Sequence, residues 1–206
     1  MILADVGNRH VHICENGRVL HLSLMDAIDQ YGTSEVAYIN VSRASGSTLA
    51  ALDGWQDISE SLSIEGEYPG MGIDRKALCL SRQQGLFVDA GSAITVDRVI
   101  DGVYQGGFIL PGLHAYAKAY AEISPVLDLP LERDIDLTEL PRDTRQSVSF
   151  GTIASIVSVI EANREGLPLY LTGGDGAYLS RYFEDAHYDE MLLFEGMKKS
   201  IQRKER

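Results

Sequence analysis

A pattern that occurs twice in the sequence constrains the fold more than any other feature. In each copy an apolar strand ends in Asp-x-Gly-polar and a hairpin follows: Asp5–Asn8 precedes an Asn16-Gly17 turn, and Asp89–Ser92 precedes an Asp101-Gly102 turn. Asn-Gly and Asp-Gly between apolar runs are strong signals for hairpin turns. One Asp-x-Gly after a strand is a common turn, but two in matched context indicate two similar lobes. We expect a ligand to bind in a cleft between such lobes.

Hydrophobic periodicity, with Gly and Pro as breaks, outlines the other elements. Besides the hairpin strands, we expect strands at 1–6, 35–41, 86–89, 169–172 and 191–194, and helices at 25–31, 76–84, 113–123, 143–163, 177–183 and 196–206. No clear period covers 42–67, and 124–142 is expected to be a surface loop. Strands that alternate with helices predict an α/β fold of mixed sheets flanked by helices.

We place the boundary between the lobes after residue 84. The N-terminal lobe, 1–84, then holds the first Asp-x-Gly loop and a Gly-x-Asp-Arg loop. The C-terminal lobe, 85–206, holds the second Asp-x-Gly loop and a Gly-Gly-Asp-Gly segment at 173–176. The terminal helix at 196–206 could pack back across the lobes.

Charge and composition argue against several classes of function. The 206-residue chain has a formal net charge of −12, and such a field repels DNA and RNA. No run approaches the roughly 20 apolar residues of a membrane span, and the N-terminus lacks the basic region of a signal peptide. Cys14 and Cys79 form no CxxC, which favours reduced thiols in a cytoplasmic protein. We expect neither a nucleic-acid partner nor membrane association.

The two Asp-x-Gly loops suit phosphate and a metal ion together. Gly7 and Gly91 let the backbone turn tightly and approach a ligand, while Asn8 and Ser92 can donate hydrogen bonds to phosphate oxygens. A carboxylate repels phosphate unless a cation lies between them, as Mg²⁺ does in phosphoryl transfer. The loops therefore predict a kinase that transfers the terminal phosphate of ATP to the hydroxyl of a small molecule.

This arrangement resembles the superfamily of acetate kinase, sugar kinases, Hsp70 chaperones and actin, whose two duplicated ribonuclease H-like lobes flank a cleft. Within that superfamily the sequence is similar to the type III pantothenate kinases from end to end. The segments that carry this resemblance are Tyr68–Arg75 with its Gly-x-Asp-Arg, Asp89–Asp97, Tyr104–Gly112 with Tyr-x-Gly-Gly-x-Ile-x-Pro-Gly, Ser149–Ala154, Leu171–Gly176 and Leu193–Gly196.

The resemblance implies ATP-dependent phosphorylation of pantothenate to 4′-phosphopantothenate, the first step towards coenzyme A. It also implies a homodimer, ATP with Mg²⁺, and a monovalent cation, K⁺ or NH₄⁺. Asp74 matches the base, Asp89 the ligand of the monovalent cation, and Asp5 a contact to Mg²⁺ through water. The implied pantothenate contacts are Tyr68, Gly72, Ile73, Asp74, Arg75 and Thr152, and the implied ATP contacts are Asp5, Val6, Gly7, Asn8, Arg9, His10, Val11, His12 and Ser92.

The chemistry of Asp74 and Arg75 fits these roles. Asp74 follows a glycine loop near an expected helix start, where a carboxylate stays ionised and can accept a proton from an alcohol. Arg75 offers a fixed fork of donors to an anion. The same pair could instead be a helix N-terminal Asp beside a surface Arg, and Thr152 could bond back to its own helix.

Some features of the sequence leave questions open. Arg9 stands where the family usually has Thr, so it could contact phosphate or point to solvent; Ser92 also replaces a Thr but keeps the hydroxyl. The chain is short for the family, and we expect the missing length within 32–67. His10 and His12 would share one face of a strand, but no third ligand is evident, which disfavours a metal site.

Two other functions are compatible with the sequence. A related kinase of the superfamily could act on another hydroxy acid or on a sugar. Arg9 motivates a non-catalytic nucleotide-binding regulator, although Asp5, Asp74 and Asp89 are all present, which favours an active enzyme.

Overall fold

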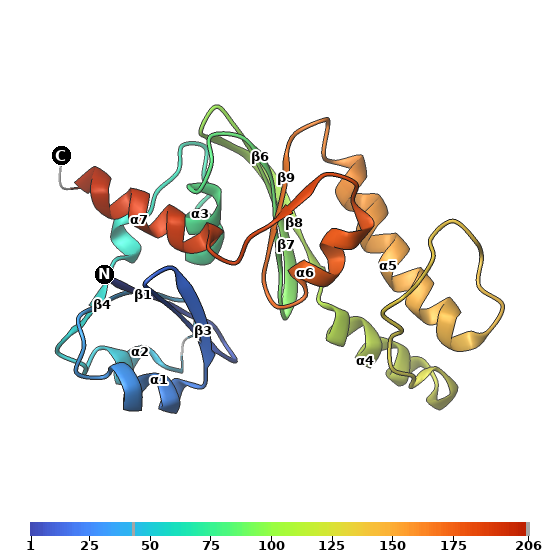
Figure 1. Cartoon of the computed structure of the whole chain (residues 1–206), viewed down its shortest axis with the longest axis horizontal. Coiled ribbons are helices and arrows are strands. Elements are labelled where there is room, and N and C mark those ends of the chain that lie inside the picture. Colours follow the sequence, from blue (N-terminus) through green and yellow to red (C-terminus); the bar gives the residue numbers. More distant parts are fainter. Residues whose placement is uncertain (43, 205–206) are drawn as a thin grey trace. The chain divides into compact units, whose positions relative to one another are not determined.

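The computed structural model describes residues 1–42 and 44–204. Its contacts divide the chain into two compact units. The first unit comprises Met1–Gln83, Val99–Gln105 and Glu190–Arg206, and the second comprises Gln84–Arg98 and Gly106–Asp189. There are two five-stranded sheets, each flanked by helices (Figure 1). The predicted α/β class with two mixed sheets is therefore confirmed.

The sheet of the first unit has the strand order β3-β2-β1-β4-β5. Strand β1 (Ile2–Val6) runs antiparallel to β2 (Val11–Glu15), which pairs in turn with β3 (Arg18–Leu22). On its other side β1 runs parallel to β4 (Val36–Asn40), and β4 runs parallel to β5 (Trp55–Asp57). The sheet is thus mixed, and β3 and β5 are its edges.

The hairpin predicted at Asn16-Gly17 is confirmed. Asn16 and Gly17 have φ of 50° and 76°, the left-handed conformation that a type I′ turn requires at both positions. A two-residue turn fixes the register of the strands on either side, so Glu15 pairs with Arg18 and, further along, His12 pairs with His21.

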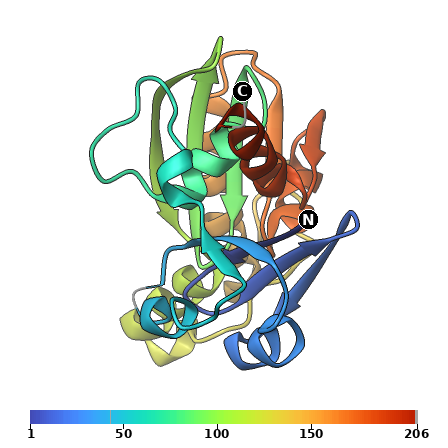
Figure 2. The same cartoon turned by 90° about the vertical axis from the view of Figure 1, so that its left-hand side faces the viewer.

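Helices cover both faces of the first sheet. Helices α1 (Leu24–Tyr31) and α2 (Gly46–Leu49) contribute buried residues to one apolar cluster with β1, β2 and β4. Helix α3 (Ile73–Cys79) packs beside α7 (Leu192–Lys204), as Figures 1 and 2 both show. A short 3₁₀ helix, η1 (Ser59–Ser61), lies within the segment that the sequence left unassigned.

One strand expected in the first unit is wrong. The strand expected at 191–194 is instead the start of α7, because Leu192, Leu193 and Phe194 are all buried, together with Met197 one turn on. A short apolar run does not by itself distinguish a buried strand from a buried helix. The terminal helix thus begins before residue 196, and residues 205 and 206 of its expected span lie outside the described residues.

Helix α3 also differs from its expected span of 76–84. It starts at Ile73, directly after Gly72, and ends at Cys79. The backbone of Gly72 is extended, with ψ of 139°, so the helix begins as soon as the glycine loop ends. Asp74 therefore lies in the first helical turn rather than in a loop before the helix.

The second sheet has the order β10-β9-β6-β7-β8. Its strands are β6 (Gly85–Ala90), β7 (Ala93–Ile100), β8 (Val103–Pro111), β9 (Leu169–Thr172) and β10 (Ala186–Tyr188). The turn between β7 and β8 has φ of 52° at Asp101 and 79° at Gly102, which confirms the second hairpin. Sequence analysis missed β10, a three-residue strand at the edge of this sheet.

Helices α4 (Leu113–Ile123) and α5 (Thr144–Ala162) agree with their predicted spans. Asp143 caps α5 by accepting from the N–H of Gln146 at 2.9 Å. Beyond them lie the 3₁₀ helices η2 (Pro125–Leu127) and η3 (Ser180–Tyr182) and the short α6 (Gly176–Leu179).

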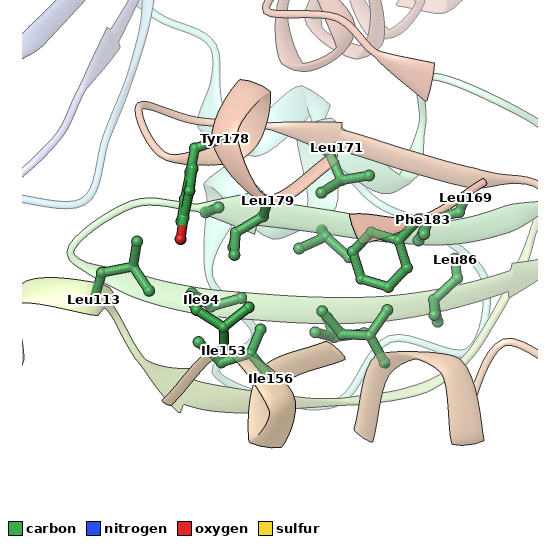
Figure 3. Packing of buried hydrophobic residues seen from close by; sticks show 14 residues of the cluster. Leu86, Ile94, Leu113, Ile153, Ile156, Leu169, Leu171, Tyr178, Leu179 and Phe183 are labelled. Atoms are coloured by element: carbon green, nitrogen blue, oxygen red, sulfur yellow. The ribbon is translucent and has the colours of Figure 1, made fainter. Parts of the chain in front are cut away.

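The core of the second unit lies between α5, the sheet and α6. Figure 3 shows Ile153 and Ile156 of α5 facing Leu86 and Ile94 of the sheet, and all four side chains are buried. This packing fixes the carboxyl end of β6, where the second Asp-x-Gly loop begins. Among the described residues, no helix is both long enough and apolar enough to cross a bilayer.

Candidate functional site

The first Asp-x-Gly loop connects β1 to β2 in the first unit. The N–H of Gly7 donates to the carbonyl of His10 at 3.0 Å, which closes the loop tightly. The side chains of Asn8, Arg9 and His10 are exposed around it. Asp5 is partly buried at the end of β1, opposite His12 of β2.

A cavity of about 170 Å³ opens beside this loop. Its lining consists of residues 6–11 with Leu24, Ser42, Ala44 and Ser45. The Oδ1 atom of Asn40 positions two of these lining residues, because it accepts from the N–H of Ser42 at 2.8 Å and from the hydroxyl of Ser45 at 3.2 Å. A glycine loop, an exposed arginine and the hydroxyl of Ser42 around one cavity can bind a phosphate group.

Sequence analysis missed Asn40, Ser42 and Ser45. Parallel pairing of β1 with β4 places Val6 opposite Asn40, so the segments after both strands leave the same edge of the sheet. Ligands of open α/β sheets commonly bind at the carboxyl ends of strands. A prediction that β1 and β4 are parallel neighbours would have brought these residues to attention.

Arg75 is the most buried of the predicted substrate residues of the first unit, with 6% of its surface exposed. Its guanidinium donates to the hydroxyl of Tyr68 at 2.6 Å and to the hydroxyl of Tyr104 at 3.3 Å. The guanidinium carbon also lies 5.8 Å from the centre of the Tyr68 ring. These contacts fix the direction of the guanidinium, so the alternative of a surface arginine is excluded.

Asp74 lies beside Arg75 in the first turn of α3. Its Oδ1 atom accepts from the N–H of Arg75 at 2.8 Å. A Cβ on residue 72 would lie 2.5 Å from that same oxygen, so Gly72 leaves the space that the carboxylate needs. The structure therefore brings together Tyr68, Gly72, Asp74 and Arg75, four of the predicted substrate residues.

Two contacts hold the loop that carries Tyr68. The ammonium of Lys76 pairs with Glu67 at 2.8 Å, and the N–H of Ile64 donates to the other carboxylate oxygen of Glu67 at 2.9 Å. Burial alone would raise the pKa of Glu67, but these hydrogen bonds and the Lys76 charge lower it below its usual value. Glu67 thus stays ionised and ties the loop to α3.

Tyr104 contacts the predicted substrate residue Arg75. Sequence analysis did not assign Tyr104 a role, although it opens one of the segments that carry the family resemblance. Its N–H donates to the carbonyl of Glu65 at 2.8 Å. Gly66 has φ of 84°, and a Cβ there would lie 2.5 Å from the carbonyl oxygen of Tyr104. The glycine therefore allows the loop to approach the β7–β8 turn closely enough for Arg75 to reach Tyr104.

The second Asp-x-Gly loop follows β6 in the second unit. Gly91 donates its N–H to the carbonyl of Ala93 at 3.0 Å, and the N–H of Gly112 donates to the carbonyl of Ser92 at 3.2 Å. A Cβ on Gly112 would lie 2.6 Å from that same carbonyl oxygen. Two segments of the resemblance, the second Asp-x-Gly loop and Pro111-Gly112, are therefore in direct contact.

A third segment joins them through the pairing of β6 with β9. Asp89 is opposite Thr172, and Gly173 follows with φ of 86°. A Cβ on Gly173 would collide with Oδ1 of Asp89 and with the carbonyl oxygen of Ala90. The N–H of Asp175 then donates to the carbonyl of Ala90 at 2.9 Å. Burial raises the pKa of Asp175, and the nearby Arg133 partly opposes that rise.

The oxygen atoms around Asp89 fit a monovalent cation. A carboxylate oxygen and the Ala90 carbonyl oxygen both lie beside Gly173, where any larger residue would displace them. Carboxylate and carbonyl oxygens are the ligands that hard cations prefer. In the part of the chain that the structure describes, no group of three or more His, Cys, Asp or Glu side chains is placed to hold a metal. A cation here would therefore depend on backbone carbonyls and water as well.

Thr152 and Ser92 differ in accessibility. Ser92 is exposed on the second loop. Thr152 is buried, and its hydroxyl donates to the carbonyl of Val148 at 2.9 Å within α5. Its proton is thus used inside its own helix, although the oxygen can still accept a hydrogen bond. Contacts from Thr152 and Ser92 to substrates remain predictions.

The histidines near the first loop form a closer group than the sequence suggested. The Nδ1 atoms of His12 and His21 are 2.6 Å apart, while the ring centre of His10 is 6.4 Å from that of His12. The strand pairing that brings His21 in follows from the Asn16-Gly17 turn, so the turn was the available signal. Burial, together with the charges of His21 and His10, lowers the pKa of His12 to about 4.

Comparison with known proteins identifies close relatives over nearly the whole chain. Residues 56–165 match the family model described as type III pantothenate kinase. A type III pantothenate kinase of Helicobacter hepaticus is 37% identical over 204 residues, covering 98% of this chain and 99% of its own length. One from Wolinella succinogenes is also 37% identical, over 206 residues, with coverage of 98% and 97%.

These relatives correct one expectation. The sequence was expected to lack a segment within 32–67, yet the chain spans 99% and 97% of these two proteins. Relative to them, no segment of that size is missing.

Solved structures with a similar fold also match nearly the whole chain. A crystal structure from Campylobacter jejuni, titled a conserved putative Baf family transcriptional activator, is 34% identical, with a TM-score of 0.89 and coverage of 100% of this chain and 99% of that one. A putative 2-dehydro-3-deoxygalactonokinase of Sinorhizobium meliloti has a TM-score of 0.55 at 11% identity, which supports the fold alone. Both similarities extend over both units of the chain.

Proposed function

The chain belongs to the type III pantothenate kinase family, and we propose that it transfers the γ-phosphoryl group of ATP to the 4′-hydroxyl of pantothenate, with Asp74 as the base. The observation that carries this proposal is the arrangement of Gly72, Asp74 and Arg75, in which the Asp74 carboxylate accepts from the backbone N–H of Arg75 and the buried Arg75 guanidinium is oriented by Tyr68. Pantothenate offers a matching pair of groups, because it has both a carboxylate and a primary hydroxyl.

Arg75 binds the anionic part of the substrate in this proposal. Tyr68 and Tyr104 support the role, because their hydroxyls fix the guanidinium from two sides. A guanidinium fork recognises a carboxylate or a phosphoryl group through paired hydrogen bonds. Thr152 would accept a hydrogen bond from the same substrate.

Asp74 orients the hydroxyl and accepts its proton as the oxygen attacks the γ-phosphorus and ADP leaves. A carboxylate is a weak base, but phosphoryl transfer depends mainly on positioning and charge neutralisation, so a modest base is sufficient. The Asp74 carboxylate is itself positioned by the N–H of Arg75 at 2.8 Å and by the space at Gly72.

ATP would bind with its phosphates at the first loop. The cavity of about 170 Å³ beside Gly7, Arg9, Ser42 and Ser45 supports this assignment. Arg9 supplies positive charge where relatives would offer a threonine hydroxyl. The remaining predicted contacts, Val6, Asn8, His10, Val11 and His12, come from the same loop and from the start of β2. Mg²⁺, held by Asp5 through water, would shield the charge of the phosphates.

The monovalent cation belongs at Asp89 in this proposal. The support is that an oxygen of the Asp89 carboxylate and the carbonyl oxygen of Ala90 both lie next to Gly173. Ser92, exposed on the same loop, would donate its hydroxyl to a phosphate oxygen.

We also infer a homodimer and a cytoplasmic location. Ile109, Ile123 and Val126 of the second unit expose 58%, 72% and 71% of their surface, and such apolar side chains favour contact with a second copy. Cys14 and Cys79 are both present as thiols rather than in a disulfide, which suits a reducing compartment. Sedimentation of the purified chain would measure the oligomeric state.

The test is an assay of ADP release with pantothenate as acceptor, with and without K⁺. A panel of sugars and other hydroxy acids serves as the comparison, since a related kinase could prefer one of them. The proposal is supported if pantothenate is the only acceptor of the panel that gives turnover. Turnover with a sugar alone would assign the related activity, and ATP binding without turnover on any acceptor would assign the regulator that Arg9 motivates.

A further inference from the structure

Two histidines of the first sheet, His12 and His21, face each other closely through one nitrogen of each ring. His12 lies on β2 and His21 on the edge strand β3, directly opposite one another. Their Nδ1 atoms are 2.6 Å apart, and the two rings are nearly perpendicular, at 80°. Two ring nitrogens at this distance share one proton, and two nitrogens slightly farther apart can bind one ion.

The carboxylate of Glu190 lies near the outer ring nitrogen of His21. A carboxylate oxygen of Glu190 lies 3.6 Å from Nε2 of His21, on the side of the ring away from His12. A carboxylate there favours the tautomer with the proton on Nε2, which leaves the lone pair of Nδ1 directed at His12. Carboxylate–histidine–metal arrangements orient a ligand in this way.

We infer that His12 and His21 form a binding site for a borderline divalent transition-metal ion such as Zn²⁺ or Cu²⁺, with Glu190 orienting His21 and water completing the coordination. Imidazole nitrogen suits these ions, whereas Mg²⁺ prefers oxygen ligands. His12 contributes its own Nδ1 after its proton moves to Nε2. The site does not rest on the proposed kinase activity.

The geometry requires a small adjustment that the chain can make. Two nitrogens bound to one zinc ion at about 2.0–2.1 Å are roughly 3.3 Å apart in a tetrahedral site. The rings must therefore separate slightly from their present distance. His21 can move, because its side chain is 53% exposed and its strand is at the edge of the sheet. His10 is not needed as a ligand.

The experiment measures metal binding directly, with the full-length chain freed of any affinity tag and treated with EDTA. Zn²⁺ is titrated in competition with a chromophoric chelator, in the presence of excess Mg²⁺. We expect one Zn²⁺ per chain, and we expect His12→Gln and His21→Gln each to weaken binding by more than about tenfold. Glu190→Gln should weaken it by about tenfold, the lower end of the usual cost for a residue that only orients a ligand.

His114→Gln is the matched control, because His114 is an exposed histidine on α4, outside this group. The affinity of the His114→Gln variant for Zn²⁺ should equal that of the unmodified chain. Circular dichroism verifies that each variant is folded, and His21→Gln keeps the test decisive if the more buried His12 variant does not fold. Absence of Zn²⁺ binding, or equal binding by His21→Gln and the unmodified chain, would overturn the inference.

Discussion

The absence of a side chain at Gly72 leaves room for the carboxylate of Asp74, since a Cβ on residue 72 would lie 2.5 Å from Oδ1 of Asp74. The Gly72→Ala variant should therefore displace the proposed base. Its φ of −56° and ψ of 139° are accessible to alanine, so the fold should be retained. We expect kcat to fall by about 10²-fold, as for a misplaced catalytic group, with little change in the thermal midpoint. Full activity would show that the position of Asp74 is unimportant.

The Asp74→Asn variant tests the role of the carboxylate itself. An amide can still hydrogen bond to the substrate hydroxyl but cannot accept its proton, so kcat should fall by about 10²–10⁴-fold while pantothenate still binds. Steady-state kinetics and calorimetric titration with pantothenate measure the two effects separately. Asp29→Asn, an exposed aspartate of α1, is the control and should behave as the unmodified chain. An unchanged kcat in Asp74→Asn removes this residue from the mechanism.

The Asp89→Ala variant should lose the response to K⁺. Removing the carboxylate beside Gly173 takes away the only charged ligand that we propose for this cation. The rate is measured against K⁺ concentration, with Na⁺ replacing K⁺ to keep the ionic strength constant. Asp128→Ala, which changes an exposed carboxylate of the second unit, controls for the loss of charge. A normal K⁺ response in Asp89→Ala would place the ion elsewhere.

The Gly196→Ala variant tests the contact between α3 and α7. A Cβ on Gly196 would overlap the carbonyl oxygen of Ala77, which belongs to backbone and cannot rotate away. We expect the free energy of unfolding to fall by about 1–3 kcal/mol, the usual cost of overpacking, measured by urea denaturation. Alanine is otherwise the better helix former by about 1 kcal/mol. A Gly196→Ala variant with a higher free energy of unfolding would thus contradict the close contact between α7 and α3. The Gln202→Ala variant, at an exposed position of α7, is the reference for the effect of alanine on the helix itself.

The stability of the protein should depend on His12 in mildly acidic solution. Burial, with the charges of His21 and His10, lowers the pKa of His12 from 6.5 to about 4 in the folded chain. The unfolded chain therefore binds a proton that the folded chain does not, and stability falls as the pH decreases from 6.5 towards 4. One such proton contributes at most about 1.4 kcal/mol per pH unit.

The measurement for this prediction is the unfolding free energy at pH values across that interval. His12→Gln should reduce the slope, because glutamine does not titrate, whereas the exposed His114→Gln should leave it unchanged. Equal slopes for the unmodified chain and His12→Gln would contradict the assignment.

Elements with a strong local signal were predictable from sequence. The turns at Asn16-Gly17 and Asp101-Gly102 require left-handed residues, and few other residues adopt that conformation at low cost. Helix α5 was predicted to within one residue at each end because Asp143 supplies a cap that a helix start needs. The loop that we predict to bind substrate was identified from its Gly-x-Asp-Arg motif, and in the structure the Asp74 carboxylate accepts from the Arg75 N–H at 2.8 Å.

The sequence by itself determined the turns, the long helices and the residue types of both Asp-x-Gly loops, because these depend on the conformational preferences of neighbouring residues. Only the tertiary structure decided that Leu192–Phe194 are helical, that Tyr104 contacts Arg75, that Asn40 shapes the cavity beside Gly7, and that Gly173 lies against Asp89. Each of these depends on which strands or helices become neighbours. That choice is made by burial and pairing between segments far apart in the chain, and no local pattern records it.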